Sequence, residues 1–289
     1  RDQLYRIQYP WGEYYDVNGA HILSLKRSKV EGKHKYGDIL NVSVEEYLTW
    51  GEGRKARYKG WKCGIALETK EQTMPPYVLG VWLGDGTSDR PQITCRDAEV
   101  IEEVIKAYGE PTSFQGDEGI SKYWGNSEML VHLKDLNLIG NKHIPENYLL
   151  GDRHQRLELL AGLVDTDGYN KTDGVEVFFK SEDLANQVLF LARSLGIHAT
   201  IYTKKARATN SKSIPCRVER KKLAKPENPK RKGLQFGFKV IPLGEGEYVG
   251  WELDGDRLYL LGDFTVTHNT TWLSYLIPKA CPSINRLYN

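Results

Sequence analysis

The sequence contains few of the residues from which metal-binding or disulfide-linked domains are built. Its 289 residues include four cysteines and seven histidines, and no two cysteines form a Cys-x-x-Cys pair. A zinc site and a disulfide framework are therefore not expected, and a reducing compartment fits this cysteine usage best. No apolar run approaches the roughly 20 residues of a membrane-spanning helix, and the first ten residues contain no apolar signal segment. We therefore expect a cytoplasmic or nuclear protein with no membrane partner.

Net charge is also nearly absent, because 40 Lys and Arg residues face 38 Asp and Glu residues. The charges are unevenly distributed: between Lys204 and Lys239, thirteen basic residues face two acidic ones. Clustered cations bind nucleic acid by releasing its counterions, although a solvated lysine-rich loop has the same composition. Aromatic residues are abundant, with 7 Trp, 17 Tyr and 7 Phe, and they supply enough apolar surface to exclude disorder throughout.

An internal repeat lies in the middle of the chain. Residues 77–86 read YVLGVWLGDG and residues 159–168 read LLAGLVDTDG. Each copy has an apolar run, a Gly, a small residue four positions later, and then Asp-Gly. The segments that follow, 92–109 and 175–196, both have the pattern of a short strand and a helix that ends at Gly. The repeat predicts two related units of mixed helix and strand in tandem.

The repeated segments have the composition of helices that pack closely. Small residues recur one helical turn apart in each copy: Gly80 and Gly84 in the first, Gly162 and Thr166 in the second. This spacing lets two helices approach backbone to backbone. If the copies pack about a pseudo-twofold axis, Asp85 and Asp167 meet at the helix ends. Neighbouring carboxylates repel unless they share cations, and Mg²⁺ in such a site can assist phosphodiester hydrolysis. A single Asp-Gly is usually a capping turn, so the second copy is what favours a functional interpretation.

Both copies resemble the LAGLIDADG signature of homing endonucleases. The second copy is almost identical to that signature, whereas the first has Leu83 where an Asp is common and retains Asp85. The resemblance implies an α+β fold with tandem pseudo-twofold units of the αββαββα type. It also implies that Asp85 and Asp167 bind Mg²⁺ and that a monomer cuts both strands of double-stranded DNA at a long specific site.

The resemblance extends to DNA contacts and to two lysines. It implies base contacts from strands near 87–94, 175–180 and 200–205, and phosphate contacts from the basic tract. In the intein-borne branch a K-x-I-P segment precedes the second signature helix; here it begins at Lys142, which is expected to reach the active centre. Lys222 is the expected pseudo-symmetric lysine, with its neighbours Lys221 and Lys225 as alternatives.

The C-terminal part of the sequence resembles the splicing motifs of an intein. Residues 248–270 read as two strands with a turn at Asp254-Gly255, and they finish with His268-Asn269-Thr270. The resemblance implies that Asn269 cyclises and cuts the 269–270 bond while His268 assists the departing amine. Thr270 would be the first extein residue and the hydroxyl nucleophile.

A second splicing motif lies near the N-terminus. Residues 14–28 resemble the intein motif whose His activates the N-terminal scissile amide, which points to His21, although Asn18 stands where Thr is commoner. Twenty residues precede His21, and no Cys or Ser nucleophile begins the chain. We therefore expect an N-terminally truncated intein, and whether another polypeptide supplies the missing part stays open. The tail 270–289 would suit the residues after the lysine of a P-loop, so the host would be an ATPase such as a helicase or terminase.

Five segments follow from these motifs. We expect the first part of a β-rich, Hint-type splicing domain at 1–72, endonuclease units at 73–152 and 153–240, the second part of the splicing domain at 241–269, and a C-extein fragment at 270–289. The leading interpretation is an intein-borne homing endonuclease with residual splicing chemistry. The alternatives are a splicing element whose nuclease has decayed but still binds DNA, and a non-cutting nucleic-acid-binding relative such as an intron maturase.

Overall fold

The computed structural model describes residues 1–30, 34–171, 174–202, 205–209, 213–222, 234–248 and 257–268. The chain divides into two units: unit 1 contains Arg1–Gly64 and Lys232–Asn289, and unit 2 contains Ile65–Arg231. The corresponding divisions expected from the sequence lie after residues 72 and 240. Within the part of the chain that the structure describes, no helix is long and apolar enough to cross a membrane.

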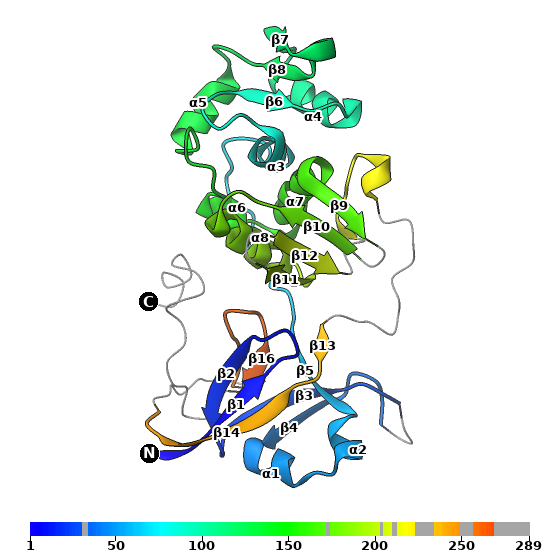
Figure 1. Cartoon of the computed structure of the whole chain (residues 1–289), viewed down its shortest axis with the longest axis vertical. Coiled ribbons are helices and arrows are strands. Elements are labelled where there is room, and N and C mark those ends of the chain that lie inside the picture. The colour runs from blue at the N-terminus through cyan, green and yellow to red at the C-terminus, as the bar shows by residue number, and fades with distance from the viewer. Residues whose placement is uncertain are drawn as a thin grey trace. The chain divides into compact units, whose positions relative to one another are not determined.

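Unit 1 consists mainly of antiparallel β-strands (Figure 1). One sheet has the order β14-β1-β2, a second has the order β13-β5-β3-β4, and β15 pairs with β16. The elements are β1 (Asp2–Gln8), β2 (Tyr14–Asn18), β3 (Ile22–Arg27), β4 (Ile39–Ser43), α1 (Val44–Thr49), α2 (Glu52–Lys55), β5 (Tyr58–Trp61), β13 (Gln235–Phe236), β14 (Lys239–Gly246), β15 (Leu258–Leu260) and β16 (Val266–His268).

Segments from both ends of the sequence form the core of unit 1. Strand β1 pairs along its whole length with β14, from Asp2 opposite Gly246 to Gln8 opposite Lys239. The core between the sheets is rich in aromatic side chains, including Tyr9, Tyr15, Tyr47, Trp50 and Phe236. In the C-terminal segment, β15 and β16 pair across residues 261–265, while the turn expected at Asp254-Gly255 lies outside the described residues.

Unit 2 contains two halves with a similar order of helices and strands. The first half contains α3 (Pro76–Asp85), β6 (Gln92–Thr94), α4 (Ala98–Tyr108), β7 (Ser113–Gln115), η1 (Asp117–Gly119), β8 (Ser121–Tyr123), α5 (Glu128–Asp135) and α6 (Glu146–Leu149). The second contains α7 (Arg153–Asp167), β9 (Gly168–Lys171), β10 (Gly174–Phe178), α8 (Glu182–Ser194), β11 (His198–Tyr202), β12 (Lys205–Thr209) and η3 (Glu219–Lys221). The expected α+β fold class is confirmed.

The sheets of the two halves share a strand order, but the sheet of the first half lacks one full strand. The second half has the order β9-β10-β12-β11, and the first has β6-β8-β7, so β6 corresponds to β10. The strand equivalent to β9 is reduced in the first half to a single bridge between Gly86 and Ile93. Pro91 lies in this shorter connection and has no backbone N–H to donate to a neighbouring strand.

Helices α3 and α7 pack against each other through glycine (Figure 1). A Cβ atom at Gly80 would lie 2.3 Å from the carbonyl oxygen of Leu159, and one at Gly162 would lie 2.1 Å from that of Tyr77. One turn later, a Cβ at Gly84 would lie 2.1 Å from Thr166 Oγ1. These separations are far below ordinary van der Waals contact, so the close approach expected from the small residues is confirmed.

The residues at each end of the two helices explain where the helices begin and end. Helix α3 begins at Pro76, where its missing N–H costs nothing. Helix α7 begins with a reciprocal pair of hydrogen bonds between Asp152 and Gln155. Each helix ends at its aspartate and is followed by a glycine, Gly86 or Gly168, whose backbone is extended rather than left-handed. Glycine is therefore required here for steric reasons, because a Cβ at Gly86 would lie 2.2 Å from the carbonyl oxygen of Trp82.

We expect Gly80→Ala and Gly162→Ala each to destabilise unit 2 by at least about 2 kcal/mol, because the added methyl group would overlap the backbone of the opposite helix. Calorimetric unfolding of the purified chain would measure the loss. Gly53→Ala is the matched control, since Gly53 lies in helix α2 and a Cβ added there would have no atom within 4 Å. Equal effects of the three substitutions would contradict the close contact between α3 and α7.

Candidate functional site

Two aspartates lie at the ends of the paired helices. Asp85 is the last residue of α3 and Asp167 is the last residue of α7. A Cβ at Gly84, the residue before Asp85, would lie 3.3 Å from Asp167 Oδ2. Burial and, next, the negative charge of Asp167 raise the pKa of Asp85 to about 6. Burial also raises the pKa of Asp167. The helix packing therefore brings the two carboxyl groups into one partly buried site.

Lys142 belongs to the same site. Its ammonium group donates to carbonyl oxygens at the end of α3, those of Leu83 (2.9 Å), Gly84 (3.2 Å) and Gly86 (2.7 Å). These carbonyls lie at the negative end of the helix dipole, where a cation is stabilised. Burial lowers the pKa of Lys142 to about 8, while the charges of Asp167 and Asp85 act in the opposite direction. Lys142 thus places a positive charge beside both carboxylates.

In the second half, Lys221 rather than Lys222 has the equivalent position. Lys221 Nζ donates to the carbonyl oxygens of Thr166 (3.1 Å) and Gly168, the counterparts of Gly84 and Gly86. Lys222 instead forms an ion pair with Glu219, with 2.6 Å between its Nζ and Glu219 Oε2. The choice of Lys222 is therefore corrected to Lys221. The adjacent side chains of Lys221 and Lys222 at the end of η3 point in different directions. The number of residues from Asp167 could not show which of the two reaches the helix end. Lys225 lies outside the described residues.

Further polar groups act on the carboxylates. Burial raises the pKa of Asp167, and the positive charges of Lys142, Lys221 and then Lys180, beyond the end of β10, offset part of this rise. The thiol of Cys95 hydrogen-bonds to Asp85, and burial raises the pKa of this thiol to about 12, so it remains a protonated donor. No pattern in the sequence assigned a role to Cys95. The surrounding cations make the site suitable for an anionic substrate.

The donor atoms of this site fit a hard divalent cation. Proteins typically hold Mg²⁺ with one or two carboxylates, and water and substrate phosphates complete its coordination. Asp85 and Asp167 supply two carboxylates, and their mutual repulsion would be relieved by a shared cation. Within the described ranges, no group of three or more His, Cys, Asp or Glu side chains gathers to hold a metal ion. The two aspartates would therefore need water and phosphate as additional ligands.

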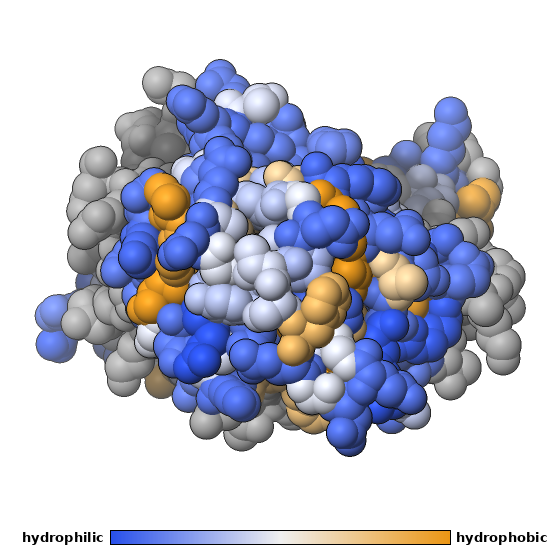
Figure 2. Space-filling view, turned by 90° about the horizontal axis from the view of Figure 1, so that it is seen from above, coloured by the Kyte–Doolittle hydropathy of each residue, from blue (hydrophilic) through white to orange (hydrophobic). Residues whose placement is uncertain are grey.

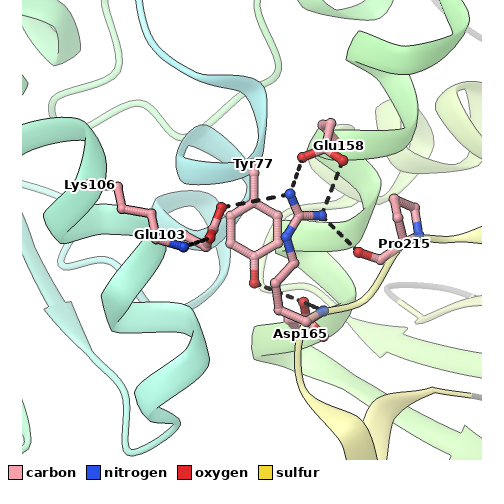
Figure 3. A network of polar contacts seen from close by, with 7 residues as sticks. Tyr77, Glu103, Lys106, Glu158, Asp165 and Pro215 are labelled. Carbon is pink, nitrogen blue, oxygen red and sulfur yellow. Dashed lines mark hydrogen bonds and ion pairs between the residues drawn. The ribbon is translucent and has the colours of Figure 1, made fainter.

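One aspartate of the repeated segment lies away from this site. Asp165 is completely buried and accepts a hydrogen bond from the hydroxyl of Tyr77 at 2.8 Å (Figure 3). It also accepts from the backbone N–H groups of Arg217 (2.6 Å) and Val218 (3.3 Å). Sequence comparison of the two copies did not select it, because Leu83 occupies the matching position of the first copy. An acidic residue within an apolar helix was the signal that could have identified it.

Polar and aromatic side chains line one face of the second sheet. On β10, Val175 and Val177 face the core, whereas Glu176 lies on the opposite face, 4.0 Å from Lys171 Nζ and 3.9 Å from Arg207 Nε. Tyr169, on β9, is 60% exposed. Figure 2, which looks down on the molecule from above in the orientation of Figure 1, shows that hydrophilic residues predominate on that face and that its apolar patches are separate.

A second cluster of expected residues lies in unit 1. His21 is completely buried, and its Nε2 lies 2.8 Å from Oγ1 of Thr267 on β16. Burial and, next, the charge of His268 lower the pKa of His21 to about 3, so its imidazole is neutral at physiological pH. The structure thus brings together His21 and His268, which are far apart in the sequence. Asn269 and Thr270 lie outside the described residues.

The segment that leads to His268 is fixed by polar contacts in unit 1. Asp263 forms an ion pair with the buried Lys62 (Oδ2 to Nζ, 2.7 Å), and its carboxylate accepts hydrogen bonds from the backbone and hydroxyl of Thr265. The hydroxyl of Tyr9 donates to Thr265 Oγ1 at 2.9 Å. No role was expected for Lys62 or Asp263 from the sequence, because an ion pair between distant segments leaves no local pattern.

Part of the chain matches a known family model, and the chain is similar to several known proteins. Residues 154–225 match the family model of a LAGLIDADG-like domain. The replicative DNA helicase DnaB of Mycobacterium intracellulare is 35% identical over 226 residues, which make up 72% of this chain and 37% of that protein. The homothallic switching endonuclease of Saccharomyces cerevisiae is 26% identical over 249 residues, which make up 65% of this chain and 42% of that protein. The chain therefore spans less than half the length of these relatives.

Solved structures of the homing endonuclease I-DmoI also resemble the chain. One, from a study of its mesophilic variants, has a TM-score of 0.35 and 13% identity, and covers 48% of this chain and 83% of the other. Another, a complex of I-DmoI with DNA and Ca, has a TM-score of 0.34 and 14% identity over the same shares.

We expect Asp85→Asn to stabilise unit 2 at neutral pH in metal-free buffer. The pKa of about 6 in the folded chain exceeds the ordinary value of 3.8, so the wild-type chain loses stability as the pH rises from about 4 to about 6. The variant lacks this loss and should gain about 1 to 2 kcal/mol at pH 7.5, less than the full linkage value because the carboxyl group is partly exposed. Unfolding with EDTA present would measure this, and the gain should vanish at pH 3.5.

The matched control is Asp117→Asn, which neutralises an exposed carboxyl group in η1 and should change stability little at either pH. A loss of stability in Asp85→Asn at pH 7.5 would show that burial and the charge of Asp167 do not destabilise the ionised carboxylate of Asp85.

Proposed function

The chain is related to the intein-type LAGLIDADG homing endonucleases, and on this premise we propose that unit 2 is a site-specific endonuclease that cuts both strands of double-stranded DNA by Mg²⁺-dependent hydrolysis. The observation that carries the proposal is the pairing of Asp85 and Asp167 at the ends of α3 and α7, with one lysine at each helix end. One chain supplies both halves of this site, which favours a monomer as the active form.

The proposed chemistry divides between the carboxylates and the lysines. Asp85 and Asp167 would hold Mg²⁺, which when bound activates water and stabilises charge on phosphate oxygens. Lys142 and Lys221 would stabilise the negative charge that develops as water attacks phosphorus. A pKa of about 8 keeps most of Lys142 protonated at neutral pH. No covalent intermediate with the protein is required.

The proposed partner is a DNA duplex that lies along the exposed faces of the two sheets. The charged face that contains Lys171, Glu176 and Arg207 supports base contacts from β9 to β12. Basic residues of the tract 204–239 would hold phosphates, and they supply contacts that strengthen at low salt.

We expect the purified chain to cut DNA that contains an intein-free gene for a DnaB-type helicase, with Mg²⁺ and not with EDTA. Asp85→Asn and Asp167→Asn should each slow double-strand cutting by at least about 100-fold and leave DNA binding in place, because each removes a metal ligand. Gel electrophoresis measures cutting, and mobility shift measures binding. Asp135→Asn is the control, since Asp135 is exposed at the end of helix α5, and this variant should cut DNA as the wild type does.

Cutting that persists in both variants would contradict the proposed metal site. DNA binding by the wild-type chain without cutting would favour the alternative, a splicing element with a decayed nuclease. Retention of two aspartates and two lysines in matching places supports an intact centre.

We also propose that unit 1 retains the chemistry of a C-terminal splicing junction in a Hint-type domain. Asn269 would cyclise and break the 269–270 bond, His268 would assist the departing amine, and Thr270 would act as the hydroxyl nucleophile. His21, which would act at an N-terminal junction, lies within reach of the same segment through Thr267. Similarity to a helicase supports a P-loop ATPase as host, and the proposed location, cytoplasm or nucleus, follows from the host.

We expect mass spectrometry of the incubated chain to detect slow loss of residues 270–289. Asn269→Ala should abolish this loss because it removes the attacking amide, and His268→Ala should slow it. Lys222→Ala is the control, since this exposed lysine lies in unit 2 and should leave the rate unchanged. Equal loss from Asn269→Ala would show that the cleavage is not cyclisation.

A further inference from the structure

The buried carboxylate of Asp165 holds the segment that leads to Lys221. Asp165 Oδ2 accepts from the backbone N–H of Arg217 at 2.6 Å, and Oδ1 accepts from that of Val218 at 3.3 Å. Val218 is the residue at which the turn η3 begins, and its carbonyl oxygen accepts from the backbone N–H of Lys221 at 2.9 Å. A continuous series of hydrogen bonds therefore connects α7 to the residue whose ammonium group reaches the helix ends.

The side chain of Arg217 fastens the same segment to both halves of unit 2. Its guanidinium group forms two hydrogen bonds with Glu158 on α7, of 3.1 and 2.5 Å, and lies 3.7 Å from Glu103 Oε2 on α4. It also lies over the ring of Tyr77, 4.2 Å from the ring centroid (Figure 3). Because Tyr77 also donates to Asp165, the buried carboxylate and the arginine belong to one network.

In the first half, different contacts hold the segment that contains Lys142. Leu83 occupies the place that matches Asp165, so no carboxylate of α3 is available there. The segment of Lys142 is held instead by Gln187 on α8, whose Oε1 accepts from the N–H of Ile144 at 2.8 Å and whose Nε2 donates to the carbonyl of Ile144 at 3.3 Å. The two lysines therefore occupy equivalent places but depend on unrelated side chains.

We propose that Asp165 is a positioning residue for Lys221 and that Gln187 has the same task for Lys142. The inference deepens the proposed nuclease function and rests on it where cutting is the readout. Loss of Asp165 would displace one lysine and leave the other in place. The consequence is an enzyme that cuts one DNA strand slowly and the other at nearly the normal rate.

The test uses a duplex whose two strands carry different fluorescent labels. Lys221→Met and Lys142→Met first establish which strand depends on which lysine. Asp165→Asn should slow cutting of the Lys221-dependent strand by about 10-fold or more, and that of the other strand by less than about two-fold, so nicked DNA accumulates. Asparagine retains one acceptor but turns an NH₂ group toward a backbone N–H. Gln187→Leu, the matched variant, should slow the opposite strand.

Val218→Pro tests the hydrogen bond between Asp165 and Val218 by removing its donor. Val218 has a φ of −71°, the value that proline imposes, so this substitution removes its N–H without altering Asp165. It should produce the same strand bias as Asp165→Asn. Equal slowing of both strands, no slowing, or a bias toward the Lys142-dependent strand in a variant that still binds DNA would overturn the inference.

A second measurement does not depend on cutting. In chain labelled with ¹³C at lysine Cε, Asp165→Asn should shift the NMR signal of Lys221 and leave that of Lys142 unchanged, and Gln187→Leu should do the reverse. Unchanged signals in both variants would refute the positioning roles. A wild-type chain that cuts neither strand, in which these shifts are nevertheless seen on substitution, would contradict the proposed nuclease function and support the inference.

Discussion

The contact between Gly80 and Gly162 is the constraint on which unit 2 depends. Helices that meet backbone to backbone also bring their C-terminal ends together, and each end carries partial negative charge from unpaired carbonyl groups. Asp85 and Asp167 add two carboxylates at the same point, so repulsion is concentrated there. Lys142 and Lys221 offset it by donating to the terminal carbonyls. The same lysines thus pair with carbonyl groups at the helix ends and place two positive charges beside the carboxylates.

The two halves share this geometry but have diverged around it. The sheet of the second half has a full first strand and a charged face, whereas that of the first half begins with one bridge at Gly86. The helix of the second half contains the buried Asp165 where the first has Leu83. Two halves that are joined in one chain do not have to be identical, so each can change independently of the other.

Much of this arrangement could be predicted from the sequence, because it rests on local patterns that occur twice. The helix ends, the close glycine contact and the meeting of Asp85 with Asp167 all follow from the repeat. The choice between Lys221 and Lys222 could not be predicted, since counting residues from Asp167 does not distinguish two adjacent lysines in an irregular segment. The role of Asp165 was not predicted because only the second copy of the repeat has an aspartate at this position. The meeting of His21 with His268 depends on pairing between distant strands, and the resemblance to inteins rather than any spacing pointed to it.

The pairing of β1 with β14 has a consequence for how the chain is made. Residues leave the ribosome in order, so β1 and β5 emerge long before their partners β14 and β13 exist. All of unit 2, Ile65–Arg231, is complete by then and can fold as an independent domain during synthesis. Unit 1 therefore closes last, and its early strands have unsatisfied edges throughout the translation of the domain inserted between them.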